Sequence, residues 1–528
     1  MKRFFLVAVA FRLATFCLAL AADPDPNLVV NGGFEDGLKG WQTTGDVHLE
    51  TNPPTAGKAS VIIGPGAGSL AQRIETGSGN AFTVSAILEP QRTSGWVFAL
   101  RFLDKDGREV MKVDSLSDLK GTGENPRKFD HYMQPHPLTK WVEIVISKNS
   151  SEGSILVDQV GLDMPDENAA GLKPTCDLDQ AMQPFWLGKK VYNEAVLMWS
   201  QDGKPATGQL LFHPSRIISV QDYGLATNYV EGRDYTVNGR TLICTASSRI
   251  TQVRAEDLLQ GEFKWNVVGG RQVMVTYEHD DTWNHPLPAF AGNGLPNTIK
   301  KLETHEPLTV VAYGDSITHG YGESRLSHIR PFLPPWPELF VHRLETIYQD
   351  PHIQFYNSSQ SGATSQWGRE YAERMVCSLN PDLVLVAFGQ NDFWSVPADA
   401  FARNIADIMQ SVRKQNPNAE FILVSTLRFD PAYTTNSQYW NLVGAYAKKL
   451  KAMTGPGVQL ADMTALSEWV YAAKKPKDCM NDPLHPNDYF ARWYAQGVVA
   501  ALDRASGRIP AAVTPIRLFP GNRVPTPQ

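Results

Sequence analysis

Hydrophobic and polar positions alternate in two different ways along the chain, and the change falls near residue 305. Before it, short runs with a period of two residues are separated by turns rich in glycine, proline and aspartate, which is typical of antiparallel strands. After it, apolar runs rich in β-branched residues alternate with longer segments of helical periodicity. The pattern predicts a multidomain protein with β-rich domains followed by an α/β domain, whose parallel sheet has helices on both faces and therefore three layers.

The β-rich part divides into two expected domains of β-sandwich type. Residues 24–165 are predicted to form the first, with alternating runs such as residues 82–88. Residues 166–300 are predicted to form a second, accessory domain, in which Asn238-Gly239 joins two alternating runs. An Asn-Gly pair in this setting is a strong signal for a two-residue hairpin turn.

The α/β domain is expected over residues 305–503, followed by a proline-rich tail at 504–528. Strands are predicted at residues 308–313, 353–357, 382–388, 420–426 and 457–461, and helices at 336–350, 366–378, 398–414, 437–452, 463–473 and 487–503. In parallel sheets of this kind, ligands bind at the carboxyl ends of the strands. The polar residues that follow each strand are therefore the candidates for a functional site.

Residues 1–21 have the features of a signal peptide: a basic start at Lys2-Arg3, an apolar stretch, and a small-x-small motif that places cleavage near Ala21. Arg12 interrupts the apolar stretch, so a membrane span is not expected. We expect a secreted or periplasmic protein. The formal net charge of -6 comes without a long basic run, which argues against nucleic acid as a partner.

Four cysteines lie beyond the signal peptide, namely Cys176, Cys244, Cys377 and Cys479. An even number in an exported chain permits disulfides, but their spacing does not indicate which would pair. Two or more of them are expected to be buried free thiols. No Cys-x-x-Cys motif suggests a zinc site.

Four polar segments follow the predicted strands or precede the last helix. They are Gly314-Asp315-Ser316, the segment 357–364 with Gly362, Gly389-Gln390-Asn391-Asp392 and Asp482-Pro483-Leu484-His485. A serine can attack an ester only if a base removes its proton, and His485 is the one histidine beyond residue 352. Asp482 is placed to orient that imidazole. The N–H groups of Ser316 and Gly362 and the amide of Asn391 can stabilise an oxyanion.

These four segments, in this order, resemble the conserved blocks of the SGNH (GDSL-type) hydrolase superfamily over residues 305–503. The resemblance implies an ester hydrolase that works through an acyl-enzyme without a metal or cofactor in catalysis. It assigns Ser316 as nucleophile, His485 as base, Asp482 as its orienting partner, and Ser316, Gly362 and Asn391 to the oxyanion hole.

The opening segment 27–37 and the closing segment 155–162 of the first domain resemble the jelly-roll carbohydrate-binding modules of secreted enzymes that degrade glycans. That resemblance implies a structural calcium ion held by Glu35 and Asp158. An exported chain with such a module resembles carbohydrate esterases. The expected substrate is therefore an acetylated polysaccharide or oligosaccharide of xylan or pectin type.

Trp336 and Trp394 lie beside the conserved blocks and are expected to contact the substrate. Two alternatives to a polysaccharide acetylesterase stay open. One is a lipase or lysophospholipase of the GDSL type, and the other is a glycan-binding protein whose hydrolase domain is vestigial.

Overall fold

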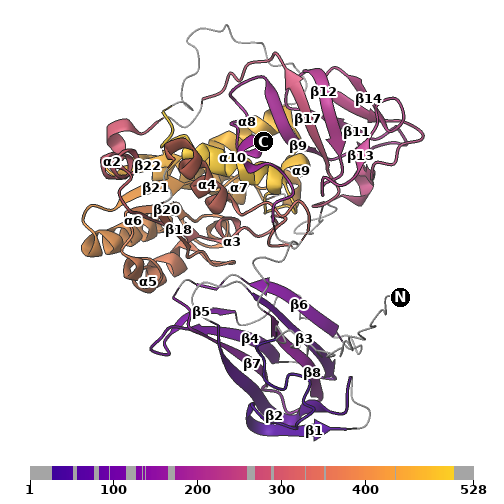
Figure 1. The fold of residues 1–528 in the computed structure, drawn as a ribbon, viewed down its shortest axis with the longest axis vertical. Helices are drawn as coiled ribbons and strands as arrows, with labels where there is room; N and C mark the ends of the chain where they lie inside the picture. Colours follow the sequence, from indigo (N-terminus) through magenta and orange to yellow (C-terminus); the bar gives the residue numbers. More distant parts are fainter. Residues whose placement is uncertain are drawn as a thin grey trace, which may run out of the picture.

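The computed structural model describes residues 27–51, 56–76, 82–93, 95–113, 127–133, 135–136, 138–163, 173–258, 268–286, 290–327, 329–349, 352–434 and 436–504. The expected signal peptide and residues 505–528 of the expected tail lie outside this part of the chain. Figure 1 shows an N-terminal β region below the other two regions, which pack against each other. The N-terminal region contacts the α/β region through His136, whose Nε2 lies 3.2 Å from the carbonyl oxygen of Met375.

The N-terminal region is an antiparallel β structure, as predicted. Its strands are β1 (Gln42–Glu50), β2 (Ser60–Glu75), β3 (Phe82–Gln91), β4 (Trp96–Leu103), β5 (Glu109–Val113), β6 (Arg127–Met133), β7 (Trp141–Lys148) and β8 (Ser154–Asp163). They lie in the order β5-β4-β7-β2-β8-β3-β6, with β1 paired to β2. The long strand β2 joins two halves, because its residues 61–63 pair with β8 and its residues 68–75 pair with β7. Every second residue of β3 and β7 faces the buried core, which gives the period of two seen in the sequence.

The second β region consists of two small sheets. Its strands are β9 (Lys190–Val196), β10 (Trp199–Ser200), β11 (Thr207–Gln209), β12 (Pro214–Gln221), β13 (Asn228–Tyr229), β14 (Tyr235–Asn238), β15 (Thr241–Cys244), β16 (Val253–Arg254) and β17 (Val273–His279). The orders are β14-β15-β11-β10-β16 and β13-β12-β17-β9. The predicted hairpin is confirmed, since Asn238 pairs with Thr241 across the turn and Gly239 has a φ of 58°.

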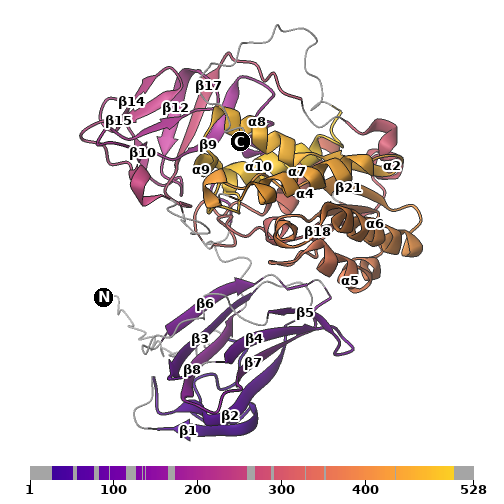
Figure 2. The ribbon, with the colours of Figure 1, turned by 180° about the vertical axis from the view of Figure 1, so that it is seen from behind.

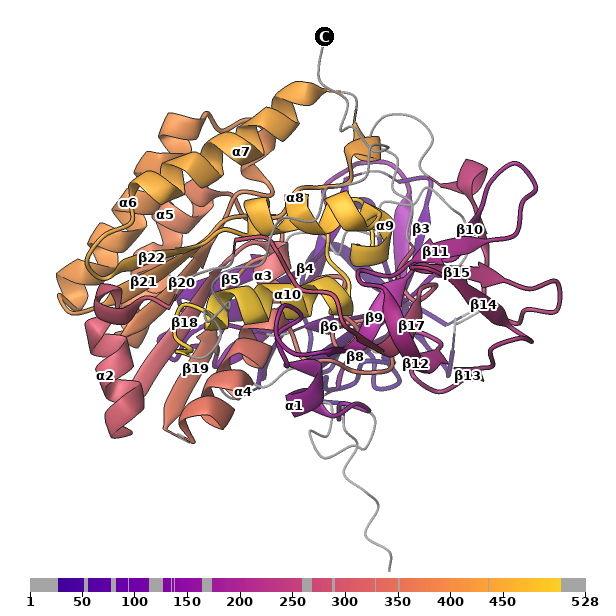
Figure 3. The same ribbon diagram turned by 90° about the horizontal axis from the view of Figure 1, so that it is seen from above.

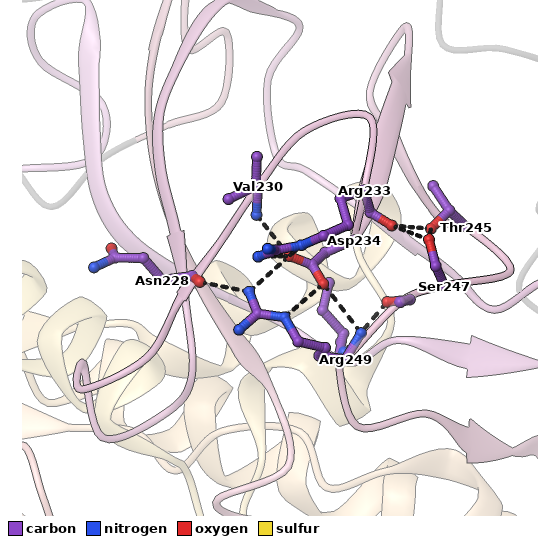
Figure 4. A network of polar contacts seen from close by, with 9 residues as sticks. Asn228, Val230, Arg233, Asp234, Thr245, Ser247 and Arg249 are labelled. Atoms are coloured by element: carbon purple, nitrogen blue, oxygen red, sulfur yellow. Dashed lines mark hydrogen bonds and ion pairs between the residues drawn. The ribbon is translucent and has the colours of Figure 1, made fainter.

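A buried carboxylate, Asp234, fixes the connection between β13 and β14 (Figure 4). Its Oδ2 accepts hydrogen bonds from the backbone N–H of Val230 at 2.8 Å and from Nη2 of Arg233 at 2.9 Å. The Arg249 side chain donates to both carboxylate oxygens, at 3.0 and 2.8 Å. The hydrogen bonds from Arg249 make the largest contribution to holding the pKa of Asp234 well below its usual value. Because both oxygens are satisfied, this cluster serves to hold the loop.

The third region is the predicted parallel sheet with helices. Its strands are β18 (Leu308–Gly314), β19 (Ile353–Asn357), β20 (Leu383–Ala387), β21 (Glu420–Val424) and β22 (Val458–Ala461), in the order β19-β18-β20-β21-β22. Its helices are α2 (Pro296–Thr304), α3 (Ser316–His319), α4 (Trp336–Tyr348), α5 (Ser365–Met375), α6 (Ala398–Gln415), α7 (Ser437–Ala452), α8 (Met463–Ala473), α9 (Pro476–Cys479) and α10 (Asp488–Val499). All five strands pair in parallel, so their carboxyl ends share one edge.

Successive residues of β18 point alternately into the two hydrophobic cores on opposite faces of the sheet, which explains the apolar run at 308–313. Val311 and Tyr313 pack with the helices α5, α6 and α7, whereas Val310 and Ala312 pack with α4, α8 and α10. Figure 3 shows the two helical layers on opposite faces of the sheet. The strand is buried on both sides and therefore needs apolar residues at consecutive positions.

Helix α10 is buried on all its faces. One side packs in the sheet core, and the other side is covered by the second β region, beside which α9 and α10 lie in Figures 1 and 2. The contact is polar as well as apolar: Arg492 donates to the carbonyl oxygen of Tyr192 at 2.8 Å, and Gln496 donates to that of Gln183 at 2.9 Å. The second β region and this face of the α/β domain therefore share one continuous core.

Cys176, Cys244, Cys377 and Cys479 are all free thiols in the structure, and the last three are buried. Among the described residues, no helix combines the length and apolar character needed to cross a membrane.

Candidate active site

The end of β18 delivers Ser316 into a tight turn. Asp315 is the N-cap of α3, and its Oδ1 accepts a hydrogen bond from the N–H of Ile317 at 3.1 Å. Gly314 is needed for close approach, because a Cβ there would lie 2.4 Å from both the carbonyl oxygen of Ala387 and Oγ1 of Thr318. The turn therefore holds Ser316 at the carboxyl end of the sheet.

Ser316, His485 and Asp482 form a continuous chain of hydrogen bonds. Oγ of Ser316 lies 2.9 Å from Nε2 of His485. Nδ1 of the same imidazole lies 3.0 and 2.9 Å from the two carboxylate oxygens of Asp482. Oδ1 of Asp482 also accepts from the backbone N–H groups of Leu484 and His485, at 2.9 and 3.0 Å. With Nδ1–H donating to the carboxylate, Nε2 is left to accept the serine proton.

Gly362 and Asn391 lie on two loops that meet beside the serine turn. The backbone N–H of Gln360 donates to the carbonyl oxygen of Gly314 at 3.0 Å, which ties the Gly362 loop to the Ser316 turn. Gly362 has a φ of 79°, which favours glycine. The Asn391 amide donates to the carbonyl oxygen of Ala363 at 3.0 Å. The structure therefore brings the two predicted oxyanion residues into contacting loops.

Two buried carboxyl groups support these loops. Oδ2 of Asp315 accepts from the backbone N–H of Gln390 at 3.1 Å, and burial raises the pKa of Asp315 to about 7. The two oxygens of Asp392 each accept from the N–H of Ser365 at 3.0 Å, at the start of α5. Burial raises the pKa of Asp392 to about 6. Both aspartates thus bind N–H groups at helix starts, and Asp315 also links the Ser316 turn to the Asn391 loop.

The two tryptophans expected at the substrate site differ in position. Trp394 is 40% exposed and follows Asn391 by three residues; its ring packs on Phe393 and Tyr439, with centroid distances of 4.7 and 5.2 Å. Trp336 is 0% exposed, and its ring centroid is 5.7 Å from that of Tyr494. The structure does not support Trp336 as a substrate contact, because α10 covers it and no substrate could reach its ring.

Two residues of the site were not singled out from the sequence. Tyr321 is 44% exposed, and its ring centroid lies 4.5 Å from that of His485. Gln390 is buried; its amide donates to the carbonyl oxygen of Leu484 at 3.1 Å and accepts from Thr426 at 2.7 Å. The sequence signal that could have found them is their position: Tyr321 follows Ser316 by five residues, and Gln390 directly precedes Asn391.

Glu35 and Asp158 of the N-terminal region both face the segment 56–58. Glu35 accepts from the N–H of Lys58 at 2.8 and 3.1 Å, and Oδ2 of Asp158 accepts from the N–H of Ala56 at 2.9 Å. Burial, with a smaller contribution from the charge of Glu35, raises the pKa of Asp158. Within the described ranges, no group of three or more His, Cys, Asp or Glu side chains could hold a metal ion. The pair fits a calcium ion only if backbone carbonyl or water oxygens supply the other ligands.

Comparison with known proteins bears on this arrangement. Residues 312–493 match the family described as "GDSL-like Lipase/Acylhydrolase family". A protein from Vibrio mimicus named "Arylesterase" is 27% identical over 201 residues, which cover 38% of this chain and 90% of that protein.

Two solved structures are also similar to parts of the chain. Axe2, described as an acetylxylan esterase from Geobacillus stearothermophilus, is 20% identical with a TM-score of 0.30, over 38% of this chain and 96% of that one. TmCBM61, solved in complex with β-1,4-galactotriose, is 20% identical with a TM-score of 0.21, over 26% of this chain and 98% of that one. The family match and the four sequence blocks identify residues 312–493 as a hydrolase domain of the GDSL (SGNH) type.

Proposed function

We propose that this chain is a secreted serine esterase that removes O-acetyl groups from polysaccharides of the acetylxylan or pectin type. The observation that carries the proposal is the chain of hydrogen bonds from Ser316 through His485 to Asp482. All three side chains are buried, so the hydrogen bonds form largely out of contact with water.

The proposed reaction proceeds through an acetyl-enzyme at Ser316. His485 Nε2 takes the hydroxyl proton as Oγ bonds to the carbonyl carbon of the acetyl group, and Asp482 stabilises the imidazolium. The N–H groups of Ser316 and Gly362 and the amide of Asn391 donate to the developing oxyanion. The sugar hydroxyl leaves with the proton from His485. A water molecule, deprotonated by the same imidazole, then releases acetate and regenerates Ser316. No step in this scheme uses a metal or cofactor.

Exposed aromatic rings support a sugar substrate. Among the described residues, the exposed large apolar side chains include two aromatic ones, Tyr321 and Trp394. Tyr321 contacts the ring of His485, and Trp394 follows Asn391 by three residues. Aromatic faces with a polar edge suit a sugar ring, which has an apolar face and a polar rim. An esterase for long acyl chains would instead need an extended apolar surface.

The experiment compares the purified full chain with Ser316→Ala on acetylated xylan, acetylated pectin, aryl acetates and aryl esters of longer acids. We expect the wild type to release acetate from a polysaccharide and Ser316→Ala to release none above background. Preference for long acyl chains would instead indicate a lipase-type esterase. Activity on aryl esters alone would indicate an arylesterase, and a wild type inactive on every ester would indicate a vestigial domain.

A further inference from the structure

The loop that carries Asp482 and His485 runs from α9 to α10, and hydrogen bonds within the loop set its shape. The N–H of Asn481 donates to the carbonyl oxygen of His485 at 2.9 Å. The N–H of Asn487 donates to the carbonyl oxygen of Cys479 at 3.0 Å. These bonds close the two ends of the loop against each other, so a shift of Asn481 would pull directly on the backbone of His485.

Asn481 is held by the turn that leads into β17, in the second β region. The N–H groups of Val268 and Gly269 both donate to the carbonyl oxygen of Asn481, at 2.8 and 3.0 Å. A Cβ at position 269 would lie 1.4 Å from Oδ1 of Asn481, so a larger residue there would displace the Asn481 side chain. On another side, a Cβ at Gly322 would lie 3.2 Å from Cβ of Asn481. Asn481 is therefore enclosed by the β region and by the segment that follows the nucleophile.

Gln272, one residue before β17, makes a second attachment. Its side chain is 1% exposed, and Nε2 donates to the carbonyl oxygens of Met480 at 3.0 Å and Lys477 at 3.1 Å. Both acceptors belong to the chain that leads directly into Asp482. A buried amide that makes two specific hydrogen bonds fixes its partners more tightly than an apolar contact would.

A buried ion pair anchors the preceding helices to the same region. Nζ of Lys474 lies 2.5 Å from Oε1 of Glu194 in β9, and both side chains are fully buried. The N–H of Leu197 donates to Oδ1 of Asp478 in α9 at 2.7 Å. An ammonium group is costly to bury without a carboxylate beside it. Lys474 and Glu194 must therefore stay paired, which fixes the end of α8 relative to β9. The second β region (β9 to β17, called the β9–β17 region below) thus holds three neighbouring segments: the end of α8, helix α9, and the start of the loop that carries Asp482 and His485.

We propose that the β9–β17 region is a positioning element for catalysis, in which Gln272 and the Gly269 turn hold Asn481 so that His485 stays within hydrogen-bond distance of Ser316. The inference rests on the proposed function in that it takes Ser316 as the nucleophile. Gln272 contacts neither substrate nor reacting atoms, so it is a positioning residue. Catalytic groups must be held to within about 0.5 Å, and loops meet that demand only with outside support.

The test uses Gln272→Leu in the full chain, with Thr276→Val as the matched control. Thr276 lies in β17, and its two hydrogen bonds, both at 3.1 Å, join it to Asn193 in β9 and not to the loop that carries Asp482 and His485. Each variant replaces a buried polar side chain of the same region that makes two hydrogen bonds. Four quantities are measured besides the Tm: kcat and KM on an aryl acetate, the rate at which a fluorophosphonate labels Ser316, and the low-field proton NMR signal of Nδ1–H of His485.

We expect both variants to lower the Tm similarly, while only Gln272→Leu lowers kcat and the labelling rate, by about 10-fold or more, with KM changed less than about twofold. The His485 signal should shift or broaden in that variant alone. If Gln272→Leu does not fold, Gln272→Met serves in its place. Wild-type kcat, labelling and NMR signal in the folded variant would overturn the inference. A wild type that neither labels nor cleaves esters would overturn the proposed function instead, and the His485 signal would still test the positioning role.

Discussion

The hydroxyl oxygen of Ser316 lies 2.9 Å from Nε2 of His485, although 169 positions separate the two residues in the chain. The end of β18 and the loop before α10 meet at this point. The contact has the geometry that general-base activation of a serine requires. It also gives the most direct prediction.

Ser316→Ala and His485→Ala should each reduce kcat by a factor on the order of 10⁴ or more, and the double variant should be no worse than either single one. Asp482→Asn should cost on the order of 10²–10⁴-fold, because the amide can stabilise the wrong imidazole tautomer. Initial rates on an aryl acetate measure these effects. Additive losses in the double variant would show that the two residues do not act as one unit.

Asp315 is predicted to hold the Ser316 turn in place against the loop that carries Asn391. Its two oxygens accept from the N–H groups of Ile317 and Gln390, and an asparagine could accept only one of these bonds. Asp315→Asn should therefore lower kcat by about 10-fold, with KM nearly unchanged, as expected when a contact that supports the transition state is weakened. Steady-state kinetics of the purified variant measure this effect.

The same substitution changes how stability depends on pH. The folded pKa of Asp315, about 7, lies above its ordinary value of 3.8, so this group favours the folded state below pH 4 and loses that contribution as the pH rises through 7. The free energy of unfolding of Asp315→Asn should therefore fall less between pH 4 and 7 than that of the wild type. Denaturant unfolding at several pH values measures it, and identical pH profiles would contradict the prediction.

The clustering of the proposed oxyanion residues beside Ser316 could be predicted, because a parallel sheet brings all its strand ends to one edge. That rule places Ser316, Gly362 and Asn391 together without any knowledge of side-chain packing. The burial of Trp336 could not be predicted, because it depends on Tyr494 of α10, which is distant in sequence.

The complete burial of helix α10 could not be predicted from the sequence either. Its polar residues Arg492 and Gln496 would lie at the surface of an isolated α/β domain. They are buried because the second β region supplies carbonyl acceptors at Tyr192 and Gln183. Such long-range polar contacts leave no periodic signal in the chain.

Tyr321 and Trp394 are predicted to contribute to polymer binding. Tyr321→Ala and Trp394→Ala should each raise KM for an acetylated xylo-oligosaccharide by about 5- to 30-fold, the effect of losing about 1–2 kcal/mol of ring contact. The effect on a small aryl acetate should be much weaker for Trp394→Ala, because a small ester lacks the sugar rings that would stack on Trp394. Steady-state kinetics on the two substrates measure the difference. Equal losses on both substrates would show that Trp394 acts on the catalytic loops and not on the sugar.

The expected calcium site predicts a dependence of stability on metal. Glu35 and Asp158 approach the same segment, 56–58, and a bound calcium ion would offset the repulsion between the two carboxylates. Removing calcium with a chelator should lower the Tm of the N-terminal region, and adding calcium back should restore it in proportion to the logarithm of its concentration. Asp158→Asn should abolish the response. A wild-type Tm unaffected by chelator would show that these carboxylates serve only to bind the backbone N–H groups.

His136 is predicted to make the contact between the N-terminal region and the hydrolase domain sensitive to acid. Its Nδ1 accepts from the N–H of Leu138 at 3.2 Å, which leaves Nε2–H to face the carbonyl oxygen of Met375 and Oγ of Ser358, each at 3.2 Å. Burial lowers the pKa of His136 to about 4. The undocked imidazole, with a pKa near 6.5, binds a proton more readily, so the contact is fully stable above about pH 6.5 and weakens as the pH falls towards 4.

Small-angle scattering should show the molecule extending over this range. His136→Gln, which keeps a donor but cannot titrate, should remain compact, and an equal extension of both proteins would assign the acid sensitivity to other groups.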